Sequence, residues 1–222
     1  DRESAEGAVI ARVNADATAG VGVSINCETD FVAKNDSYLE LANKLADIAL
    51  EHETKDAFLA TNFEGDLSIA DKLTEQTGVI GEKIEIGGFE RLEAPFVGSY
   101  IHAGNKIATL VSLSTAVEGA AEAAKNVAMQ AAAMNPIALN EDGVDAAVIE
   151  KEIEIAKDQL RQEGKPEAML DNIAKGKIKR FFKDNTLINQ TYIKDSKQSV
   201  SAYVSSVHAD LSVTGFKRLA LV

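Results

Sequence analysis

The sequence of 222 residues contains one cysteine and three histidines, and this scarcity excludes several kinds of chemistry. A single cysteine, Cys27, forms no internal disulfide and supplies no cysteine-rich metal site, which suits a reducing, cytoplasmic location. The histidines have no spacing typical of a metal site, and they are His52, His102 and His208. No apolar run approaches the length of a membrane span, and no charged-then-apolar signal opens the chain. We therefore expect no metal site, no cofactor and no membrane partner.

Positive charge is also scarce. Lysine and arginine number 23 against 35 aspartates and glutamates, so the net charge of −12 argues against a broad nucleic-acid surface. One local basic cluster comprises Lys175, Lys177, Lys179, Arg180 and Lys183. Cations favour the C-terminal end of a helix, so we interpret this cluster as a helix end and assign it no nucleic-acid contact. The phosphate-binding patterns Gly-x-x-x-x-Gly-Lys-Ser/Thr and Gly-x-Gly-x-x-Gly are absent from the sequence.

The most informative stretch runs from residue 21 to residue 52. Val21, Val23, Ile25 and Cys27 alternate with smaller or polar residues, which predicts a strand with one buried face. A Ser-x-x-Glu capping box that begins at Ser37 predicts a helix over residues 37–52. The residues Glu28-Thr29-Asp30-Phe31 are thus expected in a turn between strand and helix.

Two side chains near this turn allow more than one interpretation. From its position alone, burial of Phe31 against the core is favoured over an exposed role. Cys27 next to Glu28 and Asp30 suggests a nucleophile, but nearby carboxylates raise the pKa of a thiol and oppose thiolate formation. Because Cys27 also lies on the apolar face of the predicted strand, a core role is the better interpretation.

Two parts of the chain follow the same plan, which is a β-hairpin, then helices, then a final strand. In the first part a less regular connection around Phe58, Leu59 and Phe63 leads to a short helix that starts at Ser68. After a turn at Gly78–Gly81, the final strand begins at Ile84 and meets a bulge or kink at Gly87-Gly88. In the second part a strand over residues 96–103 opens the hairpin, and an alanine-rich helix over residues 117–134 follows it. Gly215 interrupts the last strand. The sequence therefore predicts an α+β fold with two duplicated halves, each a small antiparallel sheet with packed helices.

Between the helices of the second half lies an inserted segment. Ile149, Ile153, Ala156 and Leu160 have the 4-3-4 spacing of a coiled coil, and a second amphipathic helix follows a break at Gly164-Lys165-Pro166. We expect an antiparallel coiled-coil hairpin, which serves a partner or self-association, or else packs sideways on the domain. The predicted organisation is a linker (1–7), an N-terminal half (8–94), a C-terminal half (95–136 and 187–222) and the insert (137–186).

Several segments, in order along the chain, resemble the translation elongation factor Ts family. Cys27-Glu-Thr-Asp-Phe-Val-Ala-Lys34 resembles the signature of that family, and Ile80-Gly-Glu-Lys-Ile84 and Gly98-Ser-Tyr-Ile-His102 resemble two further segments. Later matches are Gly164-Lys165-Pro166, Gly176–Phe181 and Val213–Phe216. Two departures accompany the resemblance. The family begins with a helical domain that this sequence lacks, so residues 1–7 resemble the linker after it, and the C-terminal helical module is absent or very short.

The resemblance implies a guanine-nucleotide exchange factor that binds the GTPase elongation factor Tu during translation elongation. The implied contact residues are Asp30, Phe31, Ile80, Gly81 and His102. Phe31 is expected to enter the partner as a wedge near its magnesium and phosphate site, and the factor itself needs no catalytic residue. Two alternatives stay open, which are an oligomerising scaffold built on the helical hairpin and a Cys27-dependent hydrolase or transferase.

Overall fold

The computed structural model describes residues 3–221, and these residues form two compact units. The first unit combines the chain up to Ala133 with the segment from Val207 onward, and the second runs from Met134 to Ser206. Helices and antiparallel sheets occur in both, which agrees with the predicted α+β class. The predicted domain boundaries stay a prediction, and Asp1, Arg2 and Val222 lie outside the described residues.

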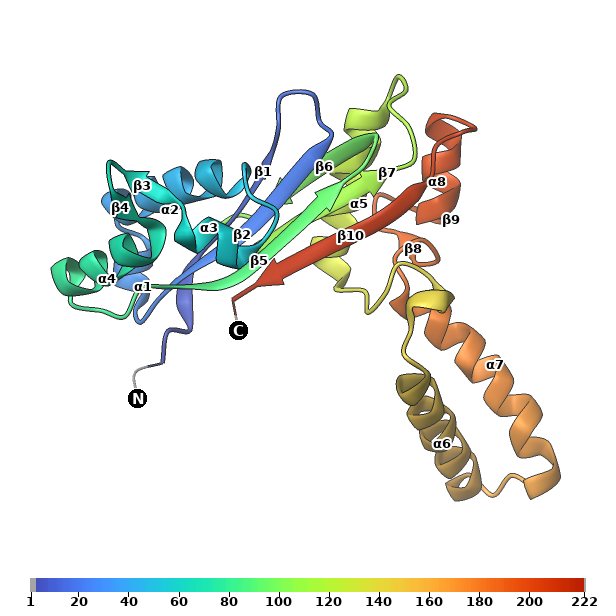
Figure 1. The fold of residues 1–222 in the computed structure, drawn as a ribbon. Coiled ribbons are helices and arrows are strands. Elements are labelled where there is room, and N and C mark those ends of the chain that lie inside the picture. The colour runs from blue at the N-terminus through green and yellow to red at the C-terminus, as the bar shows by residue number, and fades with distance from the viewer. Residues whose placement is uncertain (1–2, 222) are drawn as a thin grey trace. The chain divides into compact units, whose positions relative to one another are not determined.

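The first unit contains two three-stranded antiparallel sheets (Figure 1). In the first sheet β2 lies between β1 and β5, and in the second β7 lies between β6 and β10. The strands are β1 (Glu6–Val13), β2 (Ala19–Cys27), β5 (Glu85–Glu93), β6 (Phe96–Ile101), β7 (Ile107–Leu113) and β10 (Val213–Ala220). Each hairpin is thus joined in its sheet by a strand that comes much later in the chain.

The two sheets pack face to face. Val9 and Ala11 of β1 form one buried cluster with Ala108 and Leu110 of β7. Backbone contacts reinforce the packing, since Val97 N donates to Ala17 O at 2.7 Å. Strand β1 therefore contributes alternate side chains to two cores, because successive residues of a strand point to opposite faces.

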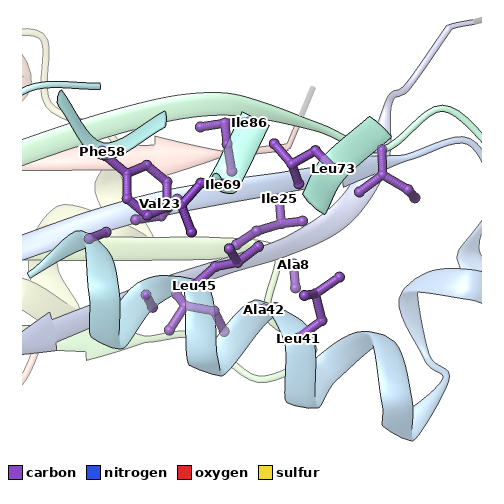
Figure 2. Close-up of a cluster of buried hydrophobic side chains, with 14 of the residues drawn as sticks. Ala8, Val23, Ile25, Leu41, Ala42, Leu45, Phe58, Ile69, Leu73 and Ile86 are labelled. Carbon is purple, nitrogen blue, oxygen red and sulfur yellow. The ribbon is translucent and has the colours of Figure 1, made fainter. Parts of the chain in front are cut away.

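The outer face of the first sheet is covered by helices α2, α3 and α4, which build the larger core. Figure 2 shows strand residues such as Val23 and Ile25 against Leu45 of α2 and Phe58 of α3. The elements over this face are α2 (Asp36–Ala49), α3 (Lys55–Ala60) and α4 (Ile69–Ile80), with the small hairpin β3 (Asn62–Glu64) and β4 (Leu67–Ser68). The sequence predicted only an irregular connection where α3 and this hairpin lie.

Helix α5 (Ala120–Met134) packs on the second sheet, as its alanine content predicted. Thr109 Oγ1 of β7 donates to Ala128 O at 2.7 Å. Gly98 of β6 faces Ala124 so closely that a methyl group added at Gly98 would overlap it. Small residues on both sides therefore bring helix and sheet into direct contact.

The second unit is built on two helices, α6 (Ala146–Gln162) and α7 (Glu167–Asn185), which pack against each other. Ala156 and Leu160 of α6 and Leu170 and Ala174 of α7 are buried. Lys157 Nζ pairs with Asp171 Oδ1 at 2.8 Å across the two helices. The remaining elements are the 3-10 turn η1 (Glu141–Gly143), strands β8 (Thr191–Tyr192) and β9 (Asp195–Ser199), and helix α8 (Val200–Val207). Both helices and their break were predicted, while the coiled-coil character stays a prediction.

Local details confirm some predictions and correct others. Ser68 caps α4 by accepting from Asp71 N at 3.1 Å, and Gly87 is the unpaired residue of a bulge in β5. The cap of α2, however, is Asn35 and not Ser37, because Asn35 Oδ1 accepts the bond from Ser37 N at 2.9 Å. The predicted strand that ended at Ala103 ends at Ile101. None of the helices in residues 3–221 is long and apolar enough to cross a membrane.

The close contact at Gly98 yields a stability test. We expect Gly98→Ala to lower the free energy of unfolding by about 1–3 kcal/mol, because the added methyl group overpacks the contact between β6 and α5. Urea denaturation of the purified chain measures the change. Gly78→Ala in α4 is the matched control, since nothing lies within 4 Å of the added group there. It should leave stability equal or raise it by roughly 0.5–1 kcal/mol. Equal behaviour of the two variants would contradict the packing argument.

Candidate functional site

The site begins at α1 (Asp30–Ala33), a single helical turn that follows β2. The predicted turn is therefore helical, with Thr29 as its N-cap: Thr29 Oγ1 accepts from Val32 N at 3.4 Å. Phe31 is 84% exposed, whereas Val32 and Ala33 pack against the core beneath. The structure thus decides between the two interpretations of Phe31 in favour of exposure.

Asp30 lies beside Phe31 at the start of α1. Its carboxylate pairs with Lys34 Nζ at 3.3 Å, and both side chains are exposed. An exposed ion pair at this i,i+4 spacing contributes little to stability. The Asp30 carboxylate is therefore exposed and only weakly held by Lys34.

The second part of the site is the C-terminal end of α4. The helix runs to Ile80, so most of the predicted turn at Gly78–Gly81 is helical, and Gly81 ends it. Gly81 has a φ of 82°, a left-handed conformation that glycine adopts without steric cost, and its N–H donates to Thr77 O at 3.0 Å. Val79 is 73% exposed, while Ile80 packs partly against the core.

Glu82 joins the two parts. One carboxylate oxygen accepts from Glu28 N and from Thr29 N, each at 3.1 Å, and the other accepts from Thr29 Oγ1 at 2.8 Å. The structure therefore brings Asp30, Phe31, Ile80 and Gly81 into one neighbourhood. Sequence reasoning did not assign a role to Glu82, although it lies in the Ile80–Ile84 segment that carried the resemblance.

His102 does not belong to α1 or to the end of α4, and it lies in the turn between β6 and β7. Its side chain is exposed, and the ring Nδ1 lies 3.0 Å from Tyr100 Oη. The backbone N–H of His102 donates to Ile107 O at 2.8 Å. The same turn contacts β1, because Val9 N donates to Asn105 O at 2.7 Å, and α1 also packs on β1. A partner contact of His102 stays a prediction.

Cys27 is a core residue. Its side chain is fully buried, and its Sγ donates to Thr29 O at 3.3 Å. Burial raises the pKa of the Cys27 thiol, and the Glu82 carboxylate adds to the rise. The sequence attributed this effect to Glu28 and Asp30, which is wrong because the folded chain brings Glu82 and Glu6 near instead. Within residues 3–221, no group of histidine, cysteine and carboxylate side chains is arranged to hold a metal ion.

These features describe a surface site with an exposed aromatic ring, Phe31, on a helical turn whose cap is held by Glu82. Residues 28–222 match the family model described as Elongation factor TS. The chain is 67% identical over 221 residues to Elongation factor Ts of Christiangramia forsetii and 66% identical to that of Flavobacterium psychrophilum. Each match covers the whole chain and 80% of the relative. Elongation factor Ts of Amoebophilus asiaticus is 45% identical over 98% of the chain and 79% of that relative.

The chain therefore belongs to the elongation factor Ts family. Members of this family are guanine-nucleotide exchange factors of translation elongation and act on elongation factor Tu. Exchange makes and breaks no covalent bond, so a site without an activated nucleophile is compatible with it.

The environment of Cys27 yields a chemical test of the enzymatic alternative. We expect the native thiol to react with a thiol-specific reagent at least roughly a hundredfold more slowly than the same thiol in urea, because it is buried and its pKa is raised. Absorbance of the released chromophore measures the reaction, and the urea-unfolded chain is the control. Rapid labelling of the native chain would support the alternative of a Cys27-dependent enzyme.

Proposed function

We propose that this chain binds elongation factor Tu and promotes release of its GDP, with Asp30, Phe31, Ile80 and Gly81 in contact with the nucleotide-binding domain of the GTPase. His102 is proposed to extend the same contact. The observation that carries the proposal is the exposure of Phe31, at 84%, on a helical turn whose other apolar residues are packed. A large aromatic side chain left in water is costly for the free protein and is typical of a contact that a partner completes.

The proposed mechanism is a wedge. Phe31 enters between side chains of the partner and disturbs the region that holds the magnesium ion and the nucleotide phosphates. Because the ion neutralises phosphate charge, its displacement weakens GDP binding. The factor and GDP are then negatively coupled, so GDP weakens the factor by the same ratio by which the factor weakens GDP.

The rigidity of the base supports this mechanism. An inserted side chain deforms the partner only if the segment that carries it is more rigid than the partner surface. Thr29, which caps α1, is held by Glu82, and the α1 residues Val32 and Ala33 pack on the core. The short helix that carries the exposed ring is therefore fixed at its N-terminus by Glu82 and along its inner face by the core.

We also propose that the two sheets arose by duplication and that α6 and α7 form a coiled-coil arm. The same connectivity in both sheets supports the first point, because each is a hairpin extended by a later strand that pairs with the second strand of the hairpin. The buried seam of Ala156, Leu160, Leu170 and Ala174 supports the second. The second half is proposed to dock on another domain of the GTPase and so to anchor the wedge.

Removal of the aromatic ring tests the wedge. We expect Phe31→Ala to slow stimulated GDP release by roughly tenfold or more, equivalent to at least ~1.4 kcal/mol of lost coupling. Release of fluorescent GDP from elongation factor Tu, followed by stopped flow over a range of factor concentrations, measures the rate. Met169→Ala, which truncates an apolar side chain that is 50% exposed on α7, is the matched control and should leave the rate unchanged. Unchanged release with Phe31→Ala would refute the wedge.

The alternative function is an oligomerising scaffold built on the helical pair. The observation that favours it is a group of exposed apolar side chains on these helices, namely Val148 and Ile155 of α6 and Met169 of α7. A groove between the helices is lined by Ile153, Ile178 and Phe182 together with charged side chains such as Lys175 and Lys179.

Deletion of the arm separates the two functions. The ends of the arm lie side by side, since Ile137 N donates to Asn185 O and Leu187 N donates to Ala138 O, each at 2.9 Å. A short glycine-serine linker can therefore replace residues 138–185. We expect the shortened chain to keep binding to elongation factor Tu within roughly tenfold in Kd, because the α1 surface is left intact. Titration calorimetry measures binding, and sedimentation velocity measures association of both chains. Loss of binding together with loss of self-association would favour the scaffold.

A further inference from the structure

Glu82 lies in a loop that is held at both of its ends. On one side, the Gly81 N–H donates to Thr77 O at 3.0 Å, and on the other, Ile84 N donates to Thr77 Oγ1 at 3.0 Å. The Ile84 side chain is buried in the larger core. The carboxylate of Glu82 is therefore presented from a fixed position.

That carboxylate controls the cap of α1. Its Oε2 accepts a hydrogen bond from the Thr29 hydroxyl group, and a lone pair of Thr29 Oγ1 accepts from Val32 N. It also accepts the two backbone N–H groups of Glu28 and Thr29. Hydrogen bonds to an ionised acceptor are stronger than those between neutral groups. A helix of four residues has too few internal bonds to hold its own conformation, so α1 depends on this cap.

We infer that Glu82 is a positioning residue for nucleotide exchange, because it holds α1 in the orientation in which Phe31 meets the partner. This inference rests on the proposed role of Phe31. A contact group that is already held in its bound geometry loses less conformational freedom on binding. Glu82 acts through Thr29 and α1, so it needs no contact with the partner or the nucleotide.

Single variants provide the first test, with fluorescent GDP release from elongation factor Tu as the readout. Glu82→Ala removes both acceptor oxygens, and with them all three hydrogen bonds, and is expected to slow stimulated release roughly tenfold. Glu82→Gln keeps an oxygen for the two N–H groups but loses the charge and the acceptor for the Thr29 hydroxyl, so we expect a smaller loss of roughly threefold. Glu75→Ala, which removes an exposed carboxylate of α4, is the matched control and should have no effect.

A double-mutant cycle separates positioning from general destabilisation. If Glu82 acts by placing Phe31, the variant that combines Phe31→Ala with Glu82→Ala should release GDP within about twofold of Phe31→Ala alone. A full further loss in that background, or no loss with Glu82→Ala alone, would overturn the inference while the wedge stands. Unchanged release with Phe31→Ala alone overturns the proposed wedge itself and the inference with it.

Circular dichroism and thermal melting show whether Glu82→Ala folds. If it does not, Thr29→Val provides the same test. It removes only the hydroxyl group and retains the two backbone bonds to Glu82. We expect a loss of roughly threefold to tenfold that disappears in the Phe31→Ala background. An equal loss in both backgrounds contradicts positioning through the cap.

Discussion

The burial of β2 on both faces is the constraint on which the first unit depends. Val21, Val23 and Ile25 point toward the helices, and the residues between them face the second sheet. Those intervening residues are small: a methyl group added at Gly22 would meet the side chain of Leu219. A strand covered on both faces cannot shift its register without exposing one set of residues and overpacking the other. Its end at Cys27, shortly before α1 begins at Asp30, is therefore fixed in space.

This fixed end explains how the chain presents an exposed aromatic residue without a flexible loop. The apolar residues of α1 divide between two environments, with Val32 and Ala33 against the core and Phe31 in solvent. Glu82 ties the cap of α1 to the end of α4, where Gly81 turns the chain back toward β5. The exposed residues of the site are thus carried by elements that belong to the larger core of the first unit. Such a site suits the wedge that we propose for Phe31.

Local patterns in the sequence predicted the elements around the site well. Alternation located β2, the serine at Ser68 located the start of α4, and the glycine pair at Gly87-Gly88 located the bulge in β5. The cap at Ser37 was wrong because Asn35, two residues earlier, offers a better-placed acceptor to the same helix. The turn at Gly78–Gly81 was wrong because glycine is tolerated near the end of a helix that Ser68 caps and that buries Ile69 and Leu73. Such choices between neighbouring residues depend on small energy differences that a pattern does not contain.

The sequence by itself determined the α+β class, the central strand, the two helices of the second unit and the family. Each of these depends on residue order over a few turns or on ordered matches along the whole chain. Only the tertiary structure decided that Phe31 is exposed and that α1 is a helical turn. It alone revealed that Glu82 meets Thr29 across 53 residues of sequence. The physical reason is that a hydrogen bond between such distant residues exists only after β2, α4 and β5 have packed into one core.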